Sequence, residues 1–159
     1  MAYLKILNEE EPTLRKKSRT VTEITPRILT LLDDMADTMH RAEGVGLAAP
    51  QVGVLRRIVV VETEPGQLYE LINPVIIEKE GEQTGYEGCL SLPGKYGIVT
   101  RPEKVTVEAT DRNGSRFRVT GTELLARCLC HEIDHLDGIL YSDVCERMLT
   151  PEEIEELKE

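Results

Sequence analysis

The chain has 159 residues, of which 40% are hydrophobic and 30% charged, and its formal net charge at pH 7 is −10. This length supports one hydrophobic core, so we expect a single domain over residues 1–159, and no apolar run is long enough to span a membrane. Because a negative surface repels phosphate backbones and the N-terminus lacks a signal-peptide pattern, we expect a cytoplasmic protein that binds neither nucleic acid directly nor a membrane.

The first half of the chain predicts an extended arm, one amphipathic helix and strands. Thr25-Pro26 is typical of an N-cap followed by proline at the first helical position. Apolar residues then recur at helical spacing and stop before Gly44. The β-branched segment 57–62 predicts a strand, and segment 69–78, which is interrupted at Asn73, predicts one or two more.

The second half predicts a hairpin that leads into a second helix. Residues 97–120 alternate between apolar and polar side chains, and Asn113-Gly114 in their midst is a strong hairpin signal. Segment 120–123, with the letters TGTE, matches a capping box. We expect a helix over residues 121–137, ended by Gly138.

A last short helix is predicted from Thr150-Pro151 onward, with glutamates in its first turn, where the helix dipole favours them. The order of elements predicts an α+β fold. In this fold, mixed or antiparallel strands pack around the second, central helix, with one helix on the N-terminal side and a short one at the C-terminus.

The central helix carries the string HEIDH, in which His131 and His135 lie four residues apart. Residues at this spacing share one helix face, so the two imidazoles point the same way and are able to bind one metal ion. Glu132 lies at the edge of that face, where its carboxylate reaches a water molecule on the ion rather than the ion itself. A bound ion lowers the pKa of such a water and the carboxylate takes its proton, which is the arrangement of a metallohydrolase.

Two imidazoles make an incomplete site, and we considered several sources for a third ligand. A metzincin pattern requires histidine at position 141, where this chain has Tyr141. A thermolysin-like site would use one of the glutamates of the acidic C-terminal segment, which more simply form a solvated face: Glu152, Glu153, Glu155 and Glu156. Cys89, within the string EGCLSLP in a tight non-helical loop, is the better candidate, because a thiolate binds zinc or ferrous iron well.

A third motif, GVGLAAPQVG over residues 44–53, is rich in small residues. It lacks the third glycine and the preceding strand of a dinucleotide-binding fingerprint. A loop that brings backbone close to a ligand fits better, with Gln51 as its one polar side chain.

Together, GVGLAAPQVG, EGCLSLP and HEIDHLDG in this order resemble the motifs of the peptide deformylase family, whose members remove the formyl group from nascent bacterial polypeptides. The resemblance covers nearly the whole chain. It implies that Cys89, His131 and His135 bind a divalent metal ion, Fe²⁺ in the cell, which Zn²⁺ or Ni²⁺ can replace. It also implies N-formylmethionyl peptides as substrates and a transient contact with the ribosome.

The resemblance further implies roles for the surrounding residues. Glu132 is expected to act as general base toward the water that attacks the formyl carbon, and then to protonate the departing amine. Gln51 and the backbone N–H of Leu90 are expected to stabilise the oxyanion, and Gly46 to contact the substrate backbone.

Helical spacing adds a hypothesis about the substrate side chain. Leu124 and Cys128 recur on the stripe of the two histidines and, with Val45, would line an apolar pocket for methionine; ordinary core packing explains Leu124 equally well. Cys130 stands where the family usually has glutamine, which changes the hydrogen bonding around the metal ligands.

Two other functions stay open on the sequence alone. A catalytically silent binding module would keep the metal as a structural element, with Cys130 as its fourth ligand. A metallopeptidase would cleave peptides that carry no formyl group.

Overall fold

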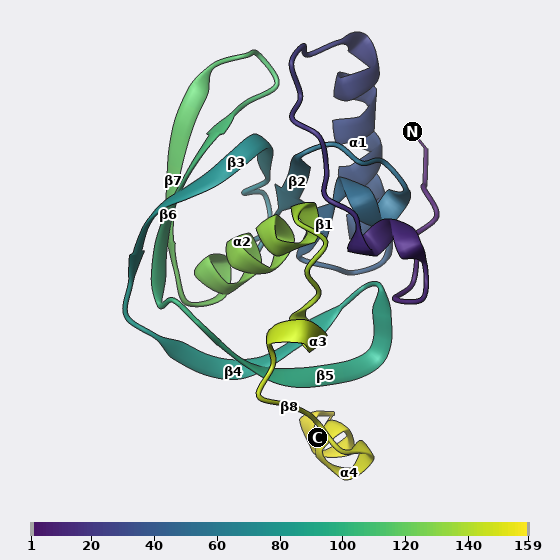
Figure 1. Cartoon of the computed structure of the whole chain (residues 1–159), viewed down its shortest axis with the longest axis vertical. Helices are drawn as coiled ribbons and strands as arrows, with labels where there is room; N and C mark the ends of the chain where they lie inside the picture. The colour runs from purple at the N-terminus through teal and green to yellow at the C-terminus, as the bar shows by residue number, and fades with distance from the viewer. Residues whose placement is uncertain (1, 159) are drawn as a thin grey trace.

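The structure, a computed structural model, describes residues 2–158 and consists of two antiparallel sheets arranged around a central helix (Figure 1). The five-stranded sheet has the order β1-β2-β3-β6-β7. Its strands are β1 (Gly46–Ala48), β2 (Ile58–Val61), β3 (Tyr69–Glu80), β6 (Lys104–Thr110) and β7 (Arg116–Thr122). The three-stranded sheet has the order β4-β5-β8. Its strands are β4 (Gln83–Cys89), β5 (Leu92–Arg101) and β8 (Arg147–Met148).

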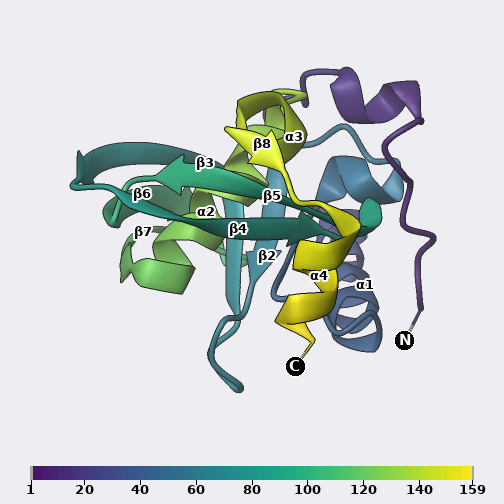
Figure 2. The same ribbon diagram turned by 90° about the horizontal axis from the view of Figure 1, so that it is seen from below.

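The helices occupy distinct places around these sheets. Four α-helices are formed, namely α1 (Pro26–Arg41), α2 (Glu123–Leu136), α3 (Tyr141–Val144) and α4 (Pro151–Leu157), with 3₁₀ turns η1 (Pro12–Arg15) and η2 (Ala49–Val52). Strands β4 and β5 run beneath α2 in Figure 1 and lie in front of it in Figure 2, which is seen from below, and β8 pairs with β5. The predicted α+β architecture, with its central helix between an N-terminal and a short C-terminal helix, is confirmed, and every pair of named strands is antiparallel. No described helix combines the length and the apolar character needed to cross a bilayer.

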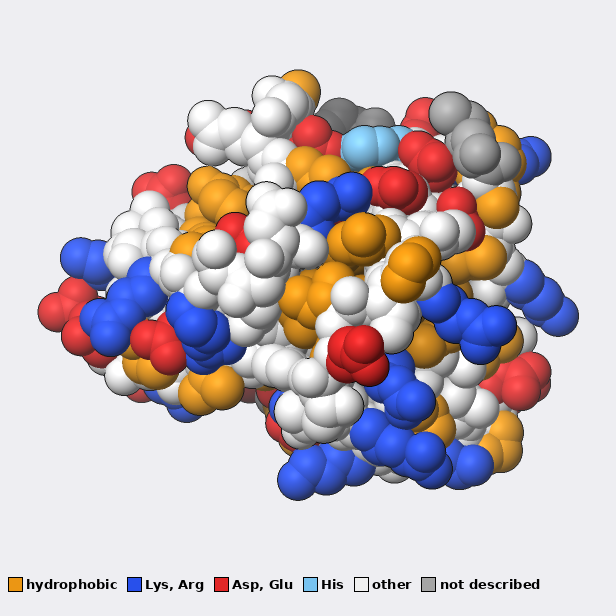
Figure 3. All heavy atoms as spheres, turned by 90° about the horizontal axis from the view of Figure 1, so that it is seen from above, with side chains coloured by type: hydrophobic (Ala, Val, Ile, Leu, Met, Phe, Trp, Pro, Cys, Tyr) orange, Lys and Arg blue, Asp and Glu red, His pale blue; other side chains and the backbone are white. Residues whose placement is uncertain are grey.

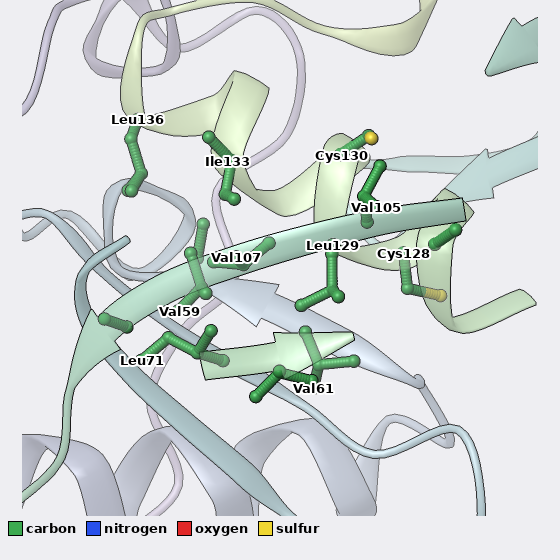
Figure 4. Close-up of a cluster of buried hydrophobic side chains, with 14 residues drawn as sticks. Val59, Val61, Leu71, Val105, Val107, Cys128, Leu129, Cys130, Ile133 and Leu136 are labelled. Atoms are coloured by element: carbon green, nitrogen blue, oxygen red, sulfur yellow. The ribbon is translucent and has the colours of Figure 1, made fainter. Parts of the chain in front are cut away.

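Strand β2 contributes side chains to two hydrophobic cores, one on each face of the larger sheet. All four of its residues are buried, so the alternation typical of a half-exposed strand is absent. Val59 and Val61 face α2 and pack with Leu129 (Figure 4), whereas Ile58 and Val60 belong to a second core that α1 covers. Helix α2 is thereby held between the two sheets, with its inner face buried and its histidines directed toward β4.

The ends of both long helices follow from local chemistry, with one correction. Thr25 accepts a hydrogen bond from the Ile28 amide at 3.3 Å, which confirms the predicted N-cap of α1. The predicted capping box at the start of α2 is wrong. Strand β7 continues to Thr122, so the Thr120 hydroxyl bonds that of Thr106 across the sheet at 2.9 Å instead.

Glycine ends α2 and closes the predicted hairpin. Gly138 has φ +75°, and a Cβ there would lie 2.5 Å from the Arg15 carbonyl oxygen, so the N-terminal arm crosses the end of α2 at a site open only to glycine. Gly114, at φ +85°, turns β6 into β7, as the Asn113-Gly114 pair predicted.

Two strand features were not resolved by the sequence. Segment 69–80 forms one strand rather than two, with an irregularity at Asn73, whose φ is +52° and whose side chain bonds both backbone groups of Val21. Cys89 lies not in a loop but at the end of β4, and Leu90 and Ser91 form the two-residue turn that leads into β5.

Candidate metal centre and active-site cavity

Three predicted metal ligands converge where the end of β4 meets α2. The Sγ of Cys89 and the ring nitrogens of His131 and His135 all lie within 4.8 Å of one another. Cys89 Sγ and His135 Nε2 are 3.4 Å apart. The helix supplies two ligands by its periodicity, and the last residue of β4, Cys89, supplies the third. Cys89 and His131 are 42 residues apart in the sequence, which gives no local pattern to bring them together.

The donor set fits a transition-metal ion. Both imidazoles are buried, and a thiol with two imidazoles suits borderline ions such as Fe²⁺, Zn²⁺ and Ni²⁺. Within residues 2–158 this is the one group of His, Cys, Asp and Glu close enough to share a metal ion. The glutamates of α4 lie outside it, and Tyr141 stacks on the His131 ring, with centroids 5.9 Å apart.

A buried carboxylate orients the first histidine. Glu87 accepts a hydrogen bond from His131 Nδ1 at 2.8 Å, which leaves Nε2 directed toward the ligand cluster. Arg101 donates twice to the same carboxylate, at 2.8 and 2.9 Å, and Arg127 donates once, at 2.7 Å. Burial opposes ionisation of Glu87, but the hydrogen bonds from Arg101 and His131 outweigh it and lower its pKa to about 2. The carboxylate is therefore held charged, and Arg101 is itself held by Asp134 at 2.7 Å.

Burial also shifts the pKa values of His135 and Glu132. Burial, together with the neighbouring His131, lowers the pKa of His135 well below its usual value, so His135 is neutral and its ring nitrogen is free to bind a metal ion. Burial also raises the pKa of Glu132 to about 7, in part against the attraction of His131. Glu132 Oε1 is buried and has no hydrogen-bond partner among the described residues. A buried carboxylate with a pKa near neutrality and an unused oxygen is suited to accept and return a proton.

The two predicted oxyanion donors lie beside the cluster. Gln51 is buried, and its Oε1 accepts from the Ala48 amide, which fixes the side-chain amide. Its Nε2 then points to Ser91 Oγ at 3.0 Å and to Cys89 Sγ at 3.4 Å. The predicted donor Leu90 lies in the turn immediately after Cys89, with its side chain against Gly44.

Gly46 keeps the approach to Glu132 open. A Cβ at position 46 would lie 2.5 Å from Glu132 Oε2, so any larger residue would collide with the carboxylate. Gly46 lies in β1, the edge strand of the five-stranded sheet. Its position next to Glu132 is what brings this backbone within reach of the site.

A cavity of about 490 Å³ opens in front of this cluster. Nine of the ten predicted site residues line it: Val45, Gly46, Gln51, Cys89, Leu90, Leu124, Cys128, His131 and Glu132. His135, the tenth, lies behind them. Val45 and Leu124 are 41% and 50% exposed, which contradicts the alternative that Leu124 is ordinary core packing. Burial raises the pKa of Cys128 to about 12, so its thiol is neutral and acts as an apolar wall.

Sequence reasoning missed the other residues that line the cavity, among them two tyrosines and an arginine. Tyr86 and Tyr96 meet edge to face at the cavity wall, with ring centroids 5.9 Å apart, and come from neighbouring strands. Arg127 also lines the cavity. It lies three residues after Leu124 and four before His131, so the same helical spacing that identified Cys128 would have found it.

Cys130 faces away from the metal ligands. It is buried in the core between α2 and the larger sheet, near Val105 (Figure 4), and does not belong to the ligand cluster. The alternative in which Cys130 is a fourth metal ligand is therefore wrong.

Comparisons with known proteins agree with this geometry. The family model described as polypeptide deformylase matches residues 3–150. The peptide deformylase of Caldanaerobacter subterraneus is 55% identical over 159 residues, covering 100% of this chain and 99% of the relative, and that of Acetivibrio thermocellus is 56% identical over the same length, covering 93% of the relative. A crystal structure of a peptide deformylase from Legionella pneumophila superposes with a TM-score of 0.87 at 43% identity, covering 99% of this chain and 96% of that one.

Proposed function

The chain belongs to the peptide deformylase family, and from that premise we propose which of its residues carry out the removal of the N-terminal formyl group from nascent peptides. The reaction is the hydrolysis of a formyl amide. Water adds to the formyl carbon, the C–N bond breaks, and formate and a free amino terminus leave. The observation that carries the assignment of roles is Glu132, a buried carboxylate with a pKa of about 7 and an unpartnered oxygen beside the Cys89, His131 and His135 cluster.

Cys89, His131 and His135 would hold one divalent cation, which we propose to be Fe²⁺ in the cell, with Zn²⁺ or Ni²⁺ able to replace it. When bound, such an ion supplies Lewis acidity, which polarises a carbonyl and makes a coordinated water more acidic. The ion also requires neutral imidazoles and a thiolate. Burial keeps His135 neutral, and Glu87 holds the Nδ1 proton of His131 away from the cluster.

Glu132 accepts the proton of the attacking water and later gives it to the departing amine. The formyl oxygen gains negative charge during the addition, and two N–H donors are in place for it. Gln51 Nε2 is held 3.4 Å from Cys89 Sγ, and the backbone N–H of Leu90 follows Cys89 in the hairpin turn. Neither group titrates near neutral pH, so both donate at any pH where the enzyme is folded.

The substrate's own groups have matching partners. Among the described strands, β1 pairs only with β2, so its other edge is available to backbone groups of a peptide at Gly46. Val45, Leu124 and Cys128 present the apolar surface that a methionine side chain would bury. In this proposal the formyl carbon would lie between Glu132 and the metal ligands.

The proposal is tested by measuring formate release from a formyl-methionyl tripeptide by anaerobically purified protein loaded with Fe²⁺. We expect rapid release, loss of release on chelation of the metal, and recovery when Ni²⁺ is added. The same peptide without the formyl group should stay intact, since a metallopeptidase would cleave it. Absence of formate release from protein with one metal ion per chain would contradict the assignment.

We also propose that the protein acts in the cytoplasm on chains emerging from the ribosome and touches the ribosome transiently. Helix α4 is acidic, which does not favour contact with RNA-rich surfaces. The N-terminal arm supports the proposal better. Lys16, Lys17 and Arg19 are exposed, with no ion pair to another described residue, and Lys and Arg side chains gather in the lower part of Figure 3. Salt-sensitive co-sedimentation with ribosomes is the measurement that checks it.

A further inference from the structure

Two cationic side chains, Lys95 and Arg127, line the cavity, and Arg127 is the one that comes from α2. Arg127 lines the cavity beside Leu124 and Cys128, one helical turn before His131. Its side chain is 9% exposed, and its neighbours among the lining residues of α2 include the apolar Leu124 and the neutral Cys128. An arginine this buried is uncommon and calls for a partner for each of its N–H groups.

The partners of Arg127 account for only part of its donors. A guanidinium has five N–H groups. Nη1 donates to Glu87 Oε2 at 2.7 Å and to the Val99 carbonyl at 3.1 Å. Nη2 has a single long bond, to the Gln83 carbonyl at 3.5 Å, and Nε has no partner within residues 2–158. Two edges of the guanidinium therefore retain hydrogen-bonding capacity.

The neighbouring strand leaves room for this group. Gly85 lies opposite the guanidinium in β4, and a Cβ there would come 3.4 Å from Arg127 Nη2. The arginine thus occupies the space between β4 and α2 that a side chain at position 85 would otherwise fill. Arg127 shares its carboxylate partner Glu87 with Arg101, which also pairs with Asp134.

We propose that Arg127 gives the methionine pocket a hydrogen-bond-donating end, so that the enzyme also deformylates peptides that begin with formyl-methionine sulfoxide. The inference rests on the proposed function, because it assumes that the pocket holds the first side chain of the substrate. A sulfoxide oxygen is a strong acceptor, whereas a thioether sulfur is a weak one. In a purely apolar pocket the sulfoxide would lose its hydrogen bonds to water without replacement, and such a substrate would be rejected.

The reaction on this substrate is the same hydrolysis. Water adds to the formyl carbon, the C–N bond breaks, and the sulfoxide leaves the site with its oxidation state unchanged. The guanidinium contributes only binding, which makes Arg127 a specificity residue. Because oxidised methionine at a nascent N-terminus would otherwise keep its formyl group, the activity would let oxidatively damaged chains be processed.

The test compares four formylated tripeptides that differ only in the first side chain, which is methionine, either of the two epimers of methionine sulfoxide, or norleucine. Norleucine has methionine's length and no acceptor, so the ratio of kcat/KM for sulfoxide to that for norleucine isolates the contribution of the donor. A hydrogen bond to a charged donor predicts a ratio of about 10 or more for at least one epimer. Arg127→Met should bring the ratio to about 1 or below, and Arg127→Lys, which keeps a cationic donor, should restore part of it.

Each ratio is taken within one variant, so a general loss of activity cancels, and metal content is measured for every preparation. In the variants Glu87 keeps both bonds from Arg101, so His131 stays oriented. A wild-type ratio of 1 or less overturns the inference without any variant, and so does an unchanged ratio in Arg127→Met. If the metal-loaded wild type fails on formyl-methionine itself, the proposed function fails; if only the sulfoxide is rejected, the inference about Arg127 alone is wrong.

Discussion

Replacing Glu132 with glutamine is expected to lower formate release about 100- to 10,000-fold while the metal ion stays bound. The substitution keeps the shape of the side chain, so the contact with Gly46 and the packing of α2 are preserved. It removes the one buried carboxylate whose oxygen lacks a partner next to the ligand cluster. The amide cannot take a proton from the attacking water or return one to the amine, so the loss should appear in kcat more than in KM.

The measurement is steady-state formate release from a formyl-methionyl tripeptide, with the metal content of each preparation determined in parallel. Glu152→Gln, the same chemical change on the exposed helix α4, is the matched control and should leave the rate unchanged. It also tests the alternative in which a C-terminal glutamate completes the metal site. Equal activity of Glu132→Gln and wild type, at equal metal content, would show that another group moves the proton.

The central helix of the site was predictable because its sequence signals, the spacing of the histidines and of the apolar residues, lie within the helix itself. A spacing of four residues places His131 and His135 on one face whatever the rest of the chain does, and the structure places both in one ligand cluster. The helix bounds also followed from nearby residues, although the capping box did not. Thr120 was assigned to the helix start because segment 120–123 matches the capping-box motif. In the structure, Thr120 lies in β7 instead, because β7 pairs with β6.

The remainder of the site depends on contacts distant in sequence. The segment Gln83–Cys89 contains two glycines and polar residues, so it lacks the β-branched pattern of a strand, and only its pairing with β5 makes it one. Cys89 was therefore placed in a loop, and it was chosen as the third ligand for its thiolate chemistry and through the resemblance rather than from spacing. The bonds from Arg101, Arg127 and His131 to Glu87 span between 14 and 44 residues, and no local pattern encodes them.

Cys89→Ala is expected to weaken metal binding by more than about 100-fold, beyond the 10- to 100-fold typical of losing a supporting hydrogen bond around a metal site. Two imidazoles remain, which is fewer than the three protein ligands that a catalytic site of this kind uses. Cys130→Ala is the matched control on the same element as the histidines. Its sulfur lies in the core between α2 and the sheet, so the variant should lose some stability to a small cavity yet bind one metal ion per chain.

Thermal unfolding with and without added Ni²⁺ separates these two effects in one experiment. A metal held at 1,000 times its Kd adds about 4 kcal/mol to the free energy of unfolding, so metal should raise the Tm of wild type and of Cys130→Ala by similar amounts. Cys89→Ala should show little or no metal-dependent increase, whatever its Tm in the absence of metal. The reverse pattern, with the increase lost in Cys130→Ala and kept in Cys89→Ala, would mean that α2 alone holds the ion through Cys130. Because the Cys130 side chain packs in the core between α2 and the larger sheet and lies outside the histidine cluster, that result would require α2 to rotate out of its core.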